Sequence, residues 1–230
     1  MIGHDPITEP RLSASLSERL RSETRALHTA AERSAFMGAL LRGRLQRPAY
    51  CALLRNLHAI YAVMEPALER HAQHPTLAPV FLPALWRTPA LEQDLHVLHG
   101  PGWPDALPLQ PAAAGYRSRL VELEAGQPDL LLAHAYVRYL GDLSGGQMLR
   151  DIVAGSVSGE GSSAVAFYDF GDAARMRGLT QAFRAGLGSV AVDARQADAL
   201  VDEAKLAFGL HQRLFDELAH AHGPFAASSG

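Results

Sequence analysis

Apolar residues recur at the three- and four-residue spacing of an α-helix along almost the whole of this 230-residue chain. The pattern predicts helices from Ser15 to about residue 40, from Pro48 to beyond Met64, and over residues 88–98, 112–125, 129–155, 173–188 and 194–219. No alternating pattern competes for these segments, and no internal repeat is evident. The expected fold class is therefore all-α, with the helices packed into one domain.

Start and stop signals support these boundaries. Ser15 and Glu18 have the spacing of a capping box, and Thr88-Pro89 is a good helix start. Pro66 is expected to kink the second helix. A Pro- and Gly-rich segment at 99–111 and a Gly- and Ser-rich segment at 155–164 indicate loops. The expected organisation is a flexible N-terminus at 1–14, one domain at 15–219 and a flexible tail at 220–230.

Composition narrows the classes of function. The formal net charge of −3 gives no general case for a nucleic acid or an anionic membrane as partner. Cys51 is the only cysteine, which excludes an intrachain disulfide and a cysteine-based metal cage. No apolar run approaches the roughly 18 residues of a membrane span, and the N-terminus lacks the pattern of a secretory signal. The expected protein is cytoplasmic and without a membrane anchor.

Few residues of the sequence stand out as candidates for catalysis or for binding a metal or cofactor. The sequence has no P-loop, Rossmann glycine fingerprint, nucleophile elbow or paired-histidine metal helix. His28 lies on the apolar stripe of the first predicted helix, with Glu32 one turn later. A carboxylate that orients an imidazole is typical of a metal or haem ligand. An ion pair at the edge of the core fits the same spacing, and spacing alone favours it.

Glycines interrupt the long helix predicted at 129–155. Gly141 and Gly145 share one face, Gly146 adjoins it, and Arg138 and Asp142 lie four residues apart beside it. A face without Cβ atoms lets a flat ligand or another helix come close to the backbone. Close helix packing explains the glycines alone, whereas a flat ligand such as haem also explains their position beside a carboxylate.

Four segments resemble the haem oxygenases in order and spacing. The glycine segment AYVRYLGDLSGGQMLR, residues 135–150, resembles the signature of the family, and LRSETRALHTAAERSAFM, residues 20–37, resembles its proximal-histidine helix. LAPVFLPALWRTPALEQDL and VDEAKLAFGLHQRLFDEL are similar to its middle region and its last helix. The resemblance covers about residues 15–219.

This resemblance implies a haem held between a proximal and a distal helix. His28 matches the proximal iron ligand, and Glu32 would accept a hydrogen bond from its Nδ1–H. Haem b would be cofactor and substrate at once, cleaved with O2 at the α-meso carbon to biliverdin, carbon monoxide and ferrous iron. The electrons would come from an external reductase or ferredoxin.

The resemblance also assigns the distal residues. Gly141, Gly145 and Gly146 would let the backbone pass close over the haem. Asp142 matches the carboxylate that orders a proton-delivering water, with Arg138 and Tyr136 in support.

His58 stands where family members carry a tyrosine. It would either alter the distal water network or form the polar end of a core helix.

Cations are expected at the haem propionates. Arg21 and Arg184 match such positions, Phe208 is assigned to the haem pocket, and Thr180 stands where a lysine is expected. Arg177 could replace that lysine. The alternative to an enzyme is a haem carrier or sensor, which would need His28 but not Asp142. A third possibility is an unrelated helical bundle in which the glycines serve only to let helices pack closely.

Overall fold

A computed structural model describes residues 15–157 and 164–225, and these residues form helices and loops without a strand. The prediction of an all-α fold is confirmed. The α-helices are α1 (Leu16–Glu32), α2 (Ala35–Leu41), α3 (Arg47–Arg70), α4 (Thr88–His99), α5 (Trp103–Ala106), α6 (Pro111–Gly126), α7 (Leu131–Ser156), α8 (Ala173–Ser189) and α9 (Ala194–His222). Short 3-10 turns lie at η1 (Ala78–Val80), η2 (Pro83–Leu85), η3 (Pro128–Leu130) and η4 (Ala166–Tyr168).

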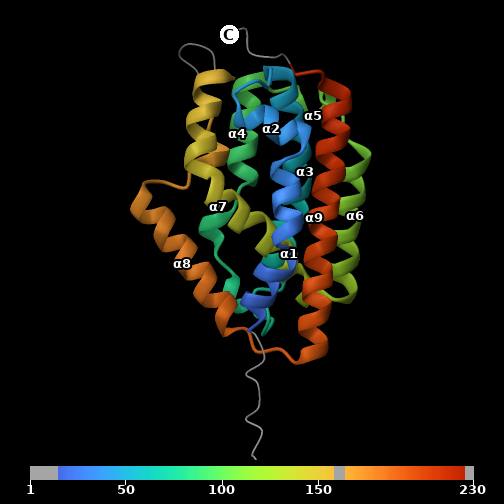
Figure 1. Ribbon diagram of the computed structural model, residues 1–230, viewed down its shortest axis with the longest axis vertical. Helices are drawn as coiled ribbons and strands as arrows, with labels where there is room; N and C mark the ends of the chain where they lie inside the picture. The colour runs from blue at the N-terminus through green and yellow to red at the C-terminus, as the bar shows by residue number, and fades with distance from the viewer. Residues whose placement is uncertain (1–14, 158–163, 226–230) are drawn as a thin grey trace, which may run out of the picture.

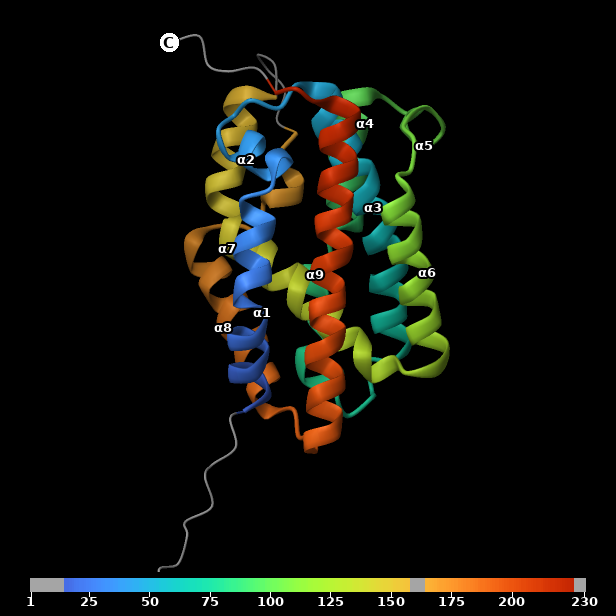
Figure 2. The same ribbon diagram turned by 45° about the vertical axis from the view of Figure 1, so that its right-hand side comes forward.

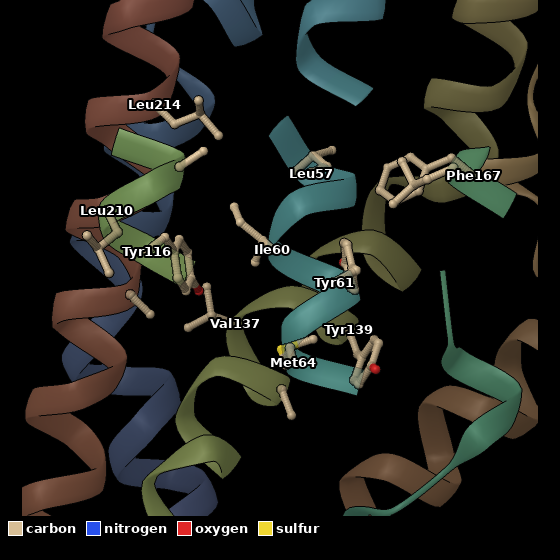
Figure 3. Close-up of a cluster of buried hydrophobic side chains, with 14 of the residues drawn as sticks. Leu57, Ile60, Tyr61, Met64, Tyr116, Val137, Tyr139, Phe167, Leu210 and Leu214 are labelled. Atoms are coloured by element: carbon tan, nitrogen blue, oxygen red, sulfur yellow. The ribbon is translucent and has the colours of Figure 1, made fainter. Parts of the chain in front are cut away.

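The long helices surround one continuous apolar core. α1 packs along α9, α3 packs against α4 and α6, and α7 packs against α9. Figures 1 and 2 show α1 and α9 running side by side, and the α7 ribbon changes direction within its length. Figure 3 shows side chains from α3, α6, α7 and α9 meeting in the core, among them Ile60, Tyr116, Val137 and Leu214.

Apart from shifts of one or two residues, the helices differ from the prediction in three places, and the first is α5, which forms within the segment 99–111 expected to be a loop. The Ser15–Glu18 capping box forms as expected, but the single helix expected to residue 40 is divided into α1 and α2. Ser34 causes the division, because its hydroxyl accepts the backbone N–H of Met37 and starts a second helix. At the other end, α9 continues to His222, three residues beyond the expected boundary at 219. Residues 1–14, 158–163 and 226–230 lie outside the described residues.

Residues 164–170, here called the strap, form one wall of the site described below. Asp94 of α4 accepts the backbone N–H groups of Ala166 and Phe167 at 2.9 and 2.8 Å. Arg87 donates to the carbonyl oxygens of Phe167 and Asp169 at 3.2 and 3.1 Å. The strap makes few regular hydrogen bonds of its own, so these two buried charged side chains replace them.

One glycine sets the position of α8. A Cβ on Gly186 would lie 1.9 Å from the carbonyl oxygen of Pro79 in η1, closer than atoms can approach. Only glycine therefore allows α8 to sit against η1 at this distance. The contact fixes the end of a helix that also packs against α1 and α7.

Candidate active site

One cavity opens between α1, α7 and α9, with the strap and part of α3 as further walls. The lining is mostly apolar, with a few polar groups directed at the same space, as is usual in ligand sites. Its lining residues are His28, Ala31, Glu32, Met37, Leu41, Leu53, Leu57, Val137, Arg138, Gly141, Asp142, Ser144, Gly145, Met148, Leu149, Phe167, Tyr168, Phe208, His211 and Phe215. The cavity thus brings together the histidine of α1 and the glycine segment of α7.

His28 lies at the more open side of this cavity. Its side chain is 46% exposed, and its Nδ1 lies 3.5 Å from a carboxylate oxygen of Glu32. The imidazole meets the ring of Phe208 edge-on, with 6.1 Å between the ring centroids. The sequence placed His28 on a buried stripe, but burial on α1 is limited to its first half, at Leu16, Leu20 and Thr24. Further along α1 the same face lines the cavity.

The opposite side holds a closed set of three polar side chains, here called the distal triad: Tyr61, Arg138 and Asp142. Arg138 donates from Nη2 to Oδ1 of Asp142 at 2.6 Å and from Nε to the hydroxyl oxygen of Tyr61 at 3.0 Å. The Tyr61 hydroxyl donates to Oδ2 of Asp142. Each carboxylate oxygen thus accepts one hydrogen bond and keeps a second lone pair.

Burial shifts the pKa values in the distal triad. Burial raises the pKa of Asp142, and the positive charge of Arg138 opposes that rise. Burial also raises the pKa of Tyr61 well above its ordinary value, so this side chain remains a hydroxyl donor. Burial alone would lower the pKa of Arg138, but the nearby Asp142 and Tyr61 outweigh it and raise the value. The guanidinium therefore stays positively charged beside the carboxyl group.

The glycines of α7 differ in their surroundings. A Cβ on Gly141 would meet nothing within 4 Å, and a Cβ on Gly145 would meet only the side chain of Leu149. Both glycines line the cavity and leave the α7 backbone open to it. Gly146 is buried on another side, where a Cβ would approach the backbone oxygen of Tyr168 at 3.4 Å. Gly146 therefore allows the strap to pack against α7.

Of the other residues predicted to belong to the site, only some line the main cavity. Phe208 lines the cavity, whereas Tyr136 is half-buried outside it. Arg21 is exposed on α1 and lines neither this cavity nor the next. Arg177, Thr180 and Arg184 of α8 share a second hollow with Ser144, which also lines the main cavity. The predicted cations of α8 thus lie beside the main cavity rather than within it.

His58 lies outside the cavity. Its Nε2 is 3.0 Å from a carboxylate oxygen of Glu92, and its ring meets that of Trp103 at 4.8 Å between centroids. The structure supports the second reading, because His58 is a half-buried polar side chain in the middle of α3 that does not line the cavity. The side chain of α3 that reaches Asp142 is Tyr61, one helical turn later, and Figure 3 shows it between Leu57 and Met64.

Sequence reasoning missed two residues of the site, Tyr61 and His211. Tyr61 lies on the apolar face of its helix, and only its hydroxyl group distinguishes it from the core residues around it. His211 is 2% exposed, lines the cavity, and places Nε2 at 3.2 Å from Nη1 of Arg138. Its three-residue distance from Phe208 could have indicated that both rings share one face of α9.

Described residues contain no group of three or more His, Cys, Asp or Glu side chains that could hold a bare metal ion. A haem iron requires less of the protein, since a single axial imidazole can hold it. The open backbone at Gly141 and the imidazole of His28 on one cavity fit such a flat group.

Comparisons with known proteins agree with this geometry. The family model described as "Heme oxygenase" matches residues 14–217. Heme oxygenase 1 of Nostoc sp. is 37% identical over 207 residues, covering 90% of this chain and 87% of that protein. Human heme oxygenase 1 is 39% identical over 208 residues, covering 88% of this chain and 71% of that protein.

Solved structures show the same fold. The heme oxygenase from Leptospira interrogans aligns with a TM-score of 0.83 at 36% identity, covering 89% of this chain and 100% of that one. Heme oxygenase-1 from Synechocystis sp., solved in complex with heme, aligns with a TM-score of 0.82 at 33% identity over 90% and 94% of the two chains. The chain is thus an all-α protein with a haem-type pocket. It belongs to the haem oxygenase family.

Proposed function

We propose that this chain binds haem between α1 and α7 and cleaves it at the α-meso carbon to biliverdin, carbon monoxide and ferrous iron. The observation that carries the proposal is one cavity with an imidazole on one side and a glycine-lined, hydrogen-bonded carboxylate on the other. A site that only stored haem would need the imidazole alone. When bound, haem supplies the iron that takes up O2 and is also the molecule oxidised.

His28 is the proximal ligand in this proposal. Glu32 lies near Nδ1, so the N–H on Nδ1 points to the carboxylate and leaves Nε2 as the atom with a free lone pair. This arrangement sets the tautomer of the imidazole and the direction of its metal-binding nitrogen. Phe208, edge-on to the ring, limits its rotation.

Asp142, on the side of the cavity opposite His28, is the residue that orients a proton-donating water in this proposal. Its two carboxylate oxygens are held by Arg138 and Tyr61, so the group cannot turn away from the cavity. The lone pair that remains on each oxygen can accept a hydrogen bond from a water molecule, which then presents its other proton towards the haem. Gly141 and Gly145 keep the space for this water and for oxygen free of side chains.

Propionate recognition comes from the hollow beside α8. Arg184 and Arg177 are the cations there, and Thr180 between them carries no charge. A guanidinium group pairs with a carboxylate in a fixed geometry, so these arginines can set the rotation of haem in its plane. Arg21 is the candidate cation of α1.

Two further parts of the proposal extend the family resemblance. Electrons come from a separate reductase or ferredoxin, and the protein acts in the cytoplasm. No helix among residues 15–157 and 164–225 has both the length and the apolar character to cross a membrane.

One experiment separates the enzyme from a haem carrier. Haemin is added to the protein, a chemical reductant is supplied in air, and the visible spectrum is followed. The proposal expects the Soret band to form, then to decay while bile-pigment absorbance grows. A Soret band that forms and persists would identify a carrier, and no Soret shift would remove haem from the function.

A further inference from the structure

His211 of α9 is a buried histidine beside the distal triad. Its Nε2 lies 3.2 Å from Nη1 of Arg138, and the side chain is 2% exposed. An arginine side chain can only donate hydrogen bonds. Nε2 of His211 must therefore accept, and the single proton of the neutral ring lies on Nδ1.

The surroundings keep this ring neutral. Burial lowers the pKa of His211 well below its ordinary value, and the charge of Arg138, followed by that of His134, lowers it further. Arg138 of α7, Tyr116 of α6 and Phe215 of α9 are the neighbours that face the ring. Described residues place no carboxylate against it that could favour a positive charge.

A second buried histidine shows that neighbours set the tautomer. His134 of α7 has Nε2 at 2.9 Å from Oε1 of Glu203 and Nδ1 at 2.9 Å from the hydroxyl of Tyr116. Burial would raise the pKa of Glu203, but hydrogen bonds from His134 and Arg119 lower it to about 2. The Glu203 carboxylate accepts a hydrogen bond from Nε2–H, so His134 carries the opposite tautomer from His211.

We propose that His211, held as the neutral Nδ1–H tautomer, is the positioning residue of the distal triad. Its Nε2 accepts a hydrogen bond from Nη1 of Arg138 and so directs the other two guanidinium nitrogens to Tyr61 and Asp142. The inference rests on the proposed function, because it gives His211 a part in holding Asp142 over the haem. His211 acts through Arg138 and is not itself a catalytic residue.

The guanidinium needs this acceptor because it is buried. Nε and Nη2 of Arg138 already donate to the triad, and His211 is the acceptor at Nη1. Without it, a charged donor would be buried with no partner and the guanidinium would turn to find one. Asp142 would then lose its fixed direction. The Nδ1–H of His211 has no hydrogen-bond partner among the described residues, so nothing else competes for the orientation of the ring.

The tautomer is tested first, on the full-length protein labelled with 15N and without haem. A long-range 1H–15N correlation spectrum of the imidazole rings is recorded between about pH 5.5 and 8. His211 is expected as the Nδ1–H tautomer and His134 as the Nε2–H tautomer, both without titration. Their signals are assigned by their loss in His211→Asn and His134→Gln. A His211 ring in the Nε2–H tautomer, or one that titrates near its ordinary pKa, would overturn the inference.

The positioning role is tested with haemin and a reductant. His211→Phe keeps the ring volume without an acceptor, and His211→Asn restores an acceptor oxygen. Haemin affinity should stay within about threefold in both. The fraction of consumed haem recovered as biliverdin should fall about tenfold in His211→Phe, the range typical for supporting residues of a metal site, and recover in His211→Asn.

The matched control is His58→Phe, the same exchange at a histidine outside the cavity, which should leave the recovered fraction unchanged. Equal losses in His211→Phe and His211→Asn would show that only the shape of the ring matters and would overturn the proposal. A wild-type protein that does not degrade haem would instead refute the proposed function, and the tautomer measurement would still decide the geometry.

Discussion

The two sides of the cavity are built in opposite ways. On the proximal side, His28 and Glu32 are 46% and 57% exposed and lie 3.5 Å apart. On the distal side, Arg138 and Asp142 are 11% and 7% exposed, 2.6 Å apart, and joined to Tyr61 and His211. Among the described residues, Nε2 of His28 has no hydrogen-bond partner, whereas Tyr61, Arg138 and Asp142 are hydrogen-bonded to one another before any ligand arrives.

The difference follows from what each side must do. A metal ligand has to keep a lone pair available, because a nitrogen already in a strong hydrogen bond would have to lose it before binding iron. A carboxylate that orders a proton donor has to be held in advance, since reorganisation during the reaction would raise the barrier. In the proposed function, the proximal side would be completed only when haem binds at His28, whereas the hydrogen bonds of the distal side are already formed by the protein.

His28→Ala should have the largest effect, because it removes the one predicted bond to iron. The cavity walls remain, so haemin should still bind, more weakly, while biliverdin formation falls by at least about 100-fold. Free imidazole should restore part of the activity, measured as bile-pigment absorbance. His58→Ala serves as the control and should behave as wild type. Full activity in His28→Ala would remove this residue from the mechanism and with it the contrast between the two sides.

Asp142→Ala should come next and break the distal side alone. Haemin affinity should change little, because the iron ligand is intact, whereas biliverdin formation should fall roughly 100-fold, the lower range for loss of a proton-transfer group. Asp142→Asn keeps the shape of the side chain but removes its charge, so it separates the effect of the charge from that of packing. The measurement is biliverdin recovered per haem consumed. An unchanged yield in Asp142→Ala would show that another group of the cavity orders the proton donor.

Arg184→Glu should have a smaller effect, which is confined to which meso carbon of the haem is cleaved. The arginine is exposed, so its pair with a propionate is worth only about 1 kcal/mol, enough to change a rotational preference by several-fold. Wild type should give mainly α-biliverdin, and the variant a mixture with the β or δ isomer, resolved by chromatography of the extracted pigment. If only the α isomer appears, Arg21 or Arg177 becomes the better candidate for the propionate.

Asp94→Asn tests the wall of the cavity, because Asp94 holds the strap and its protonation should change the free energy of unfolding. Burial raises the pKa of Asp94 from 3.8 to about 6, even though the N–H groups of the strap oppose this rise. The folded protein therefore binds a proton that the unfolded chain has released. This contribution is complete below about pH 4 and is lost as the pH rises through 6.

Wild type should thus lose up to about 3 kcal/mol of unfolding free energy between about pH 4 and 6, relative to Asp94→Asn. Urea unfolding at several pH values measures the difference, with any constant offset assigned to the lost hydrogen bond. Parallel pH profiles for the two proteins would show that Asp94 does not titrate in this range.

The sequence predicted most of the fold because its signals are local. Helix periodicity and the Ser15–Glu18 capping box depend on residues within a few turns, and both are found in the structure. The Arg138–Asp142 pair could also be predicted from the sequence, since the two residues lie four apart on one helix. Tyr61 and His211 were missed because their partners are 77 and 73 residues away, and only the packing of α3 and α9 against α7 brings them together.

The position of His28 was misjudged for a related reason. An apolar stripe predicts burial, but it does not say whether the stripe faces the core or a cavity. His58 was given a distal alternative because a resemblance aligns sequences, whereas the direction of a side chain depends on the turn of the helix. Tyr61, one turn away, makes the contact instead.

The strap has a consequence for hydrogen exchange. The amide protons of Ala166 and Phe167 lie outside the long helices, yet both are bound to the buried carboxylate of Asp94. Amides in loops usually exchange with solvent in local openings of low free energy. Here such an opening would separate a buried carboxylate from its two donors and Arg87 from its carbonyl acceptors. The cavity wall should therefore open only together with α4, as part of one cooperative unit of the fold.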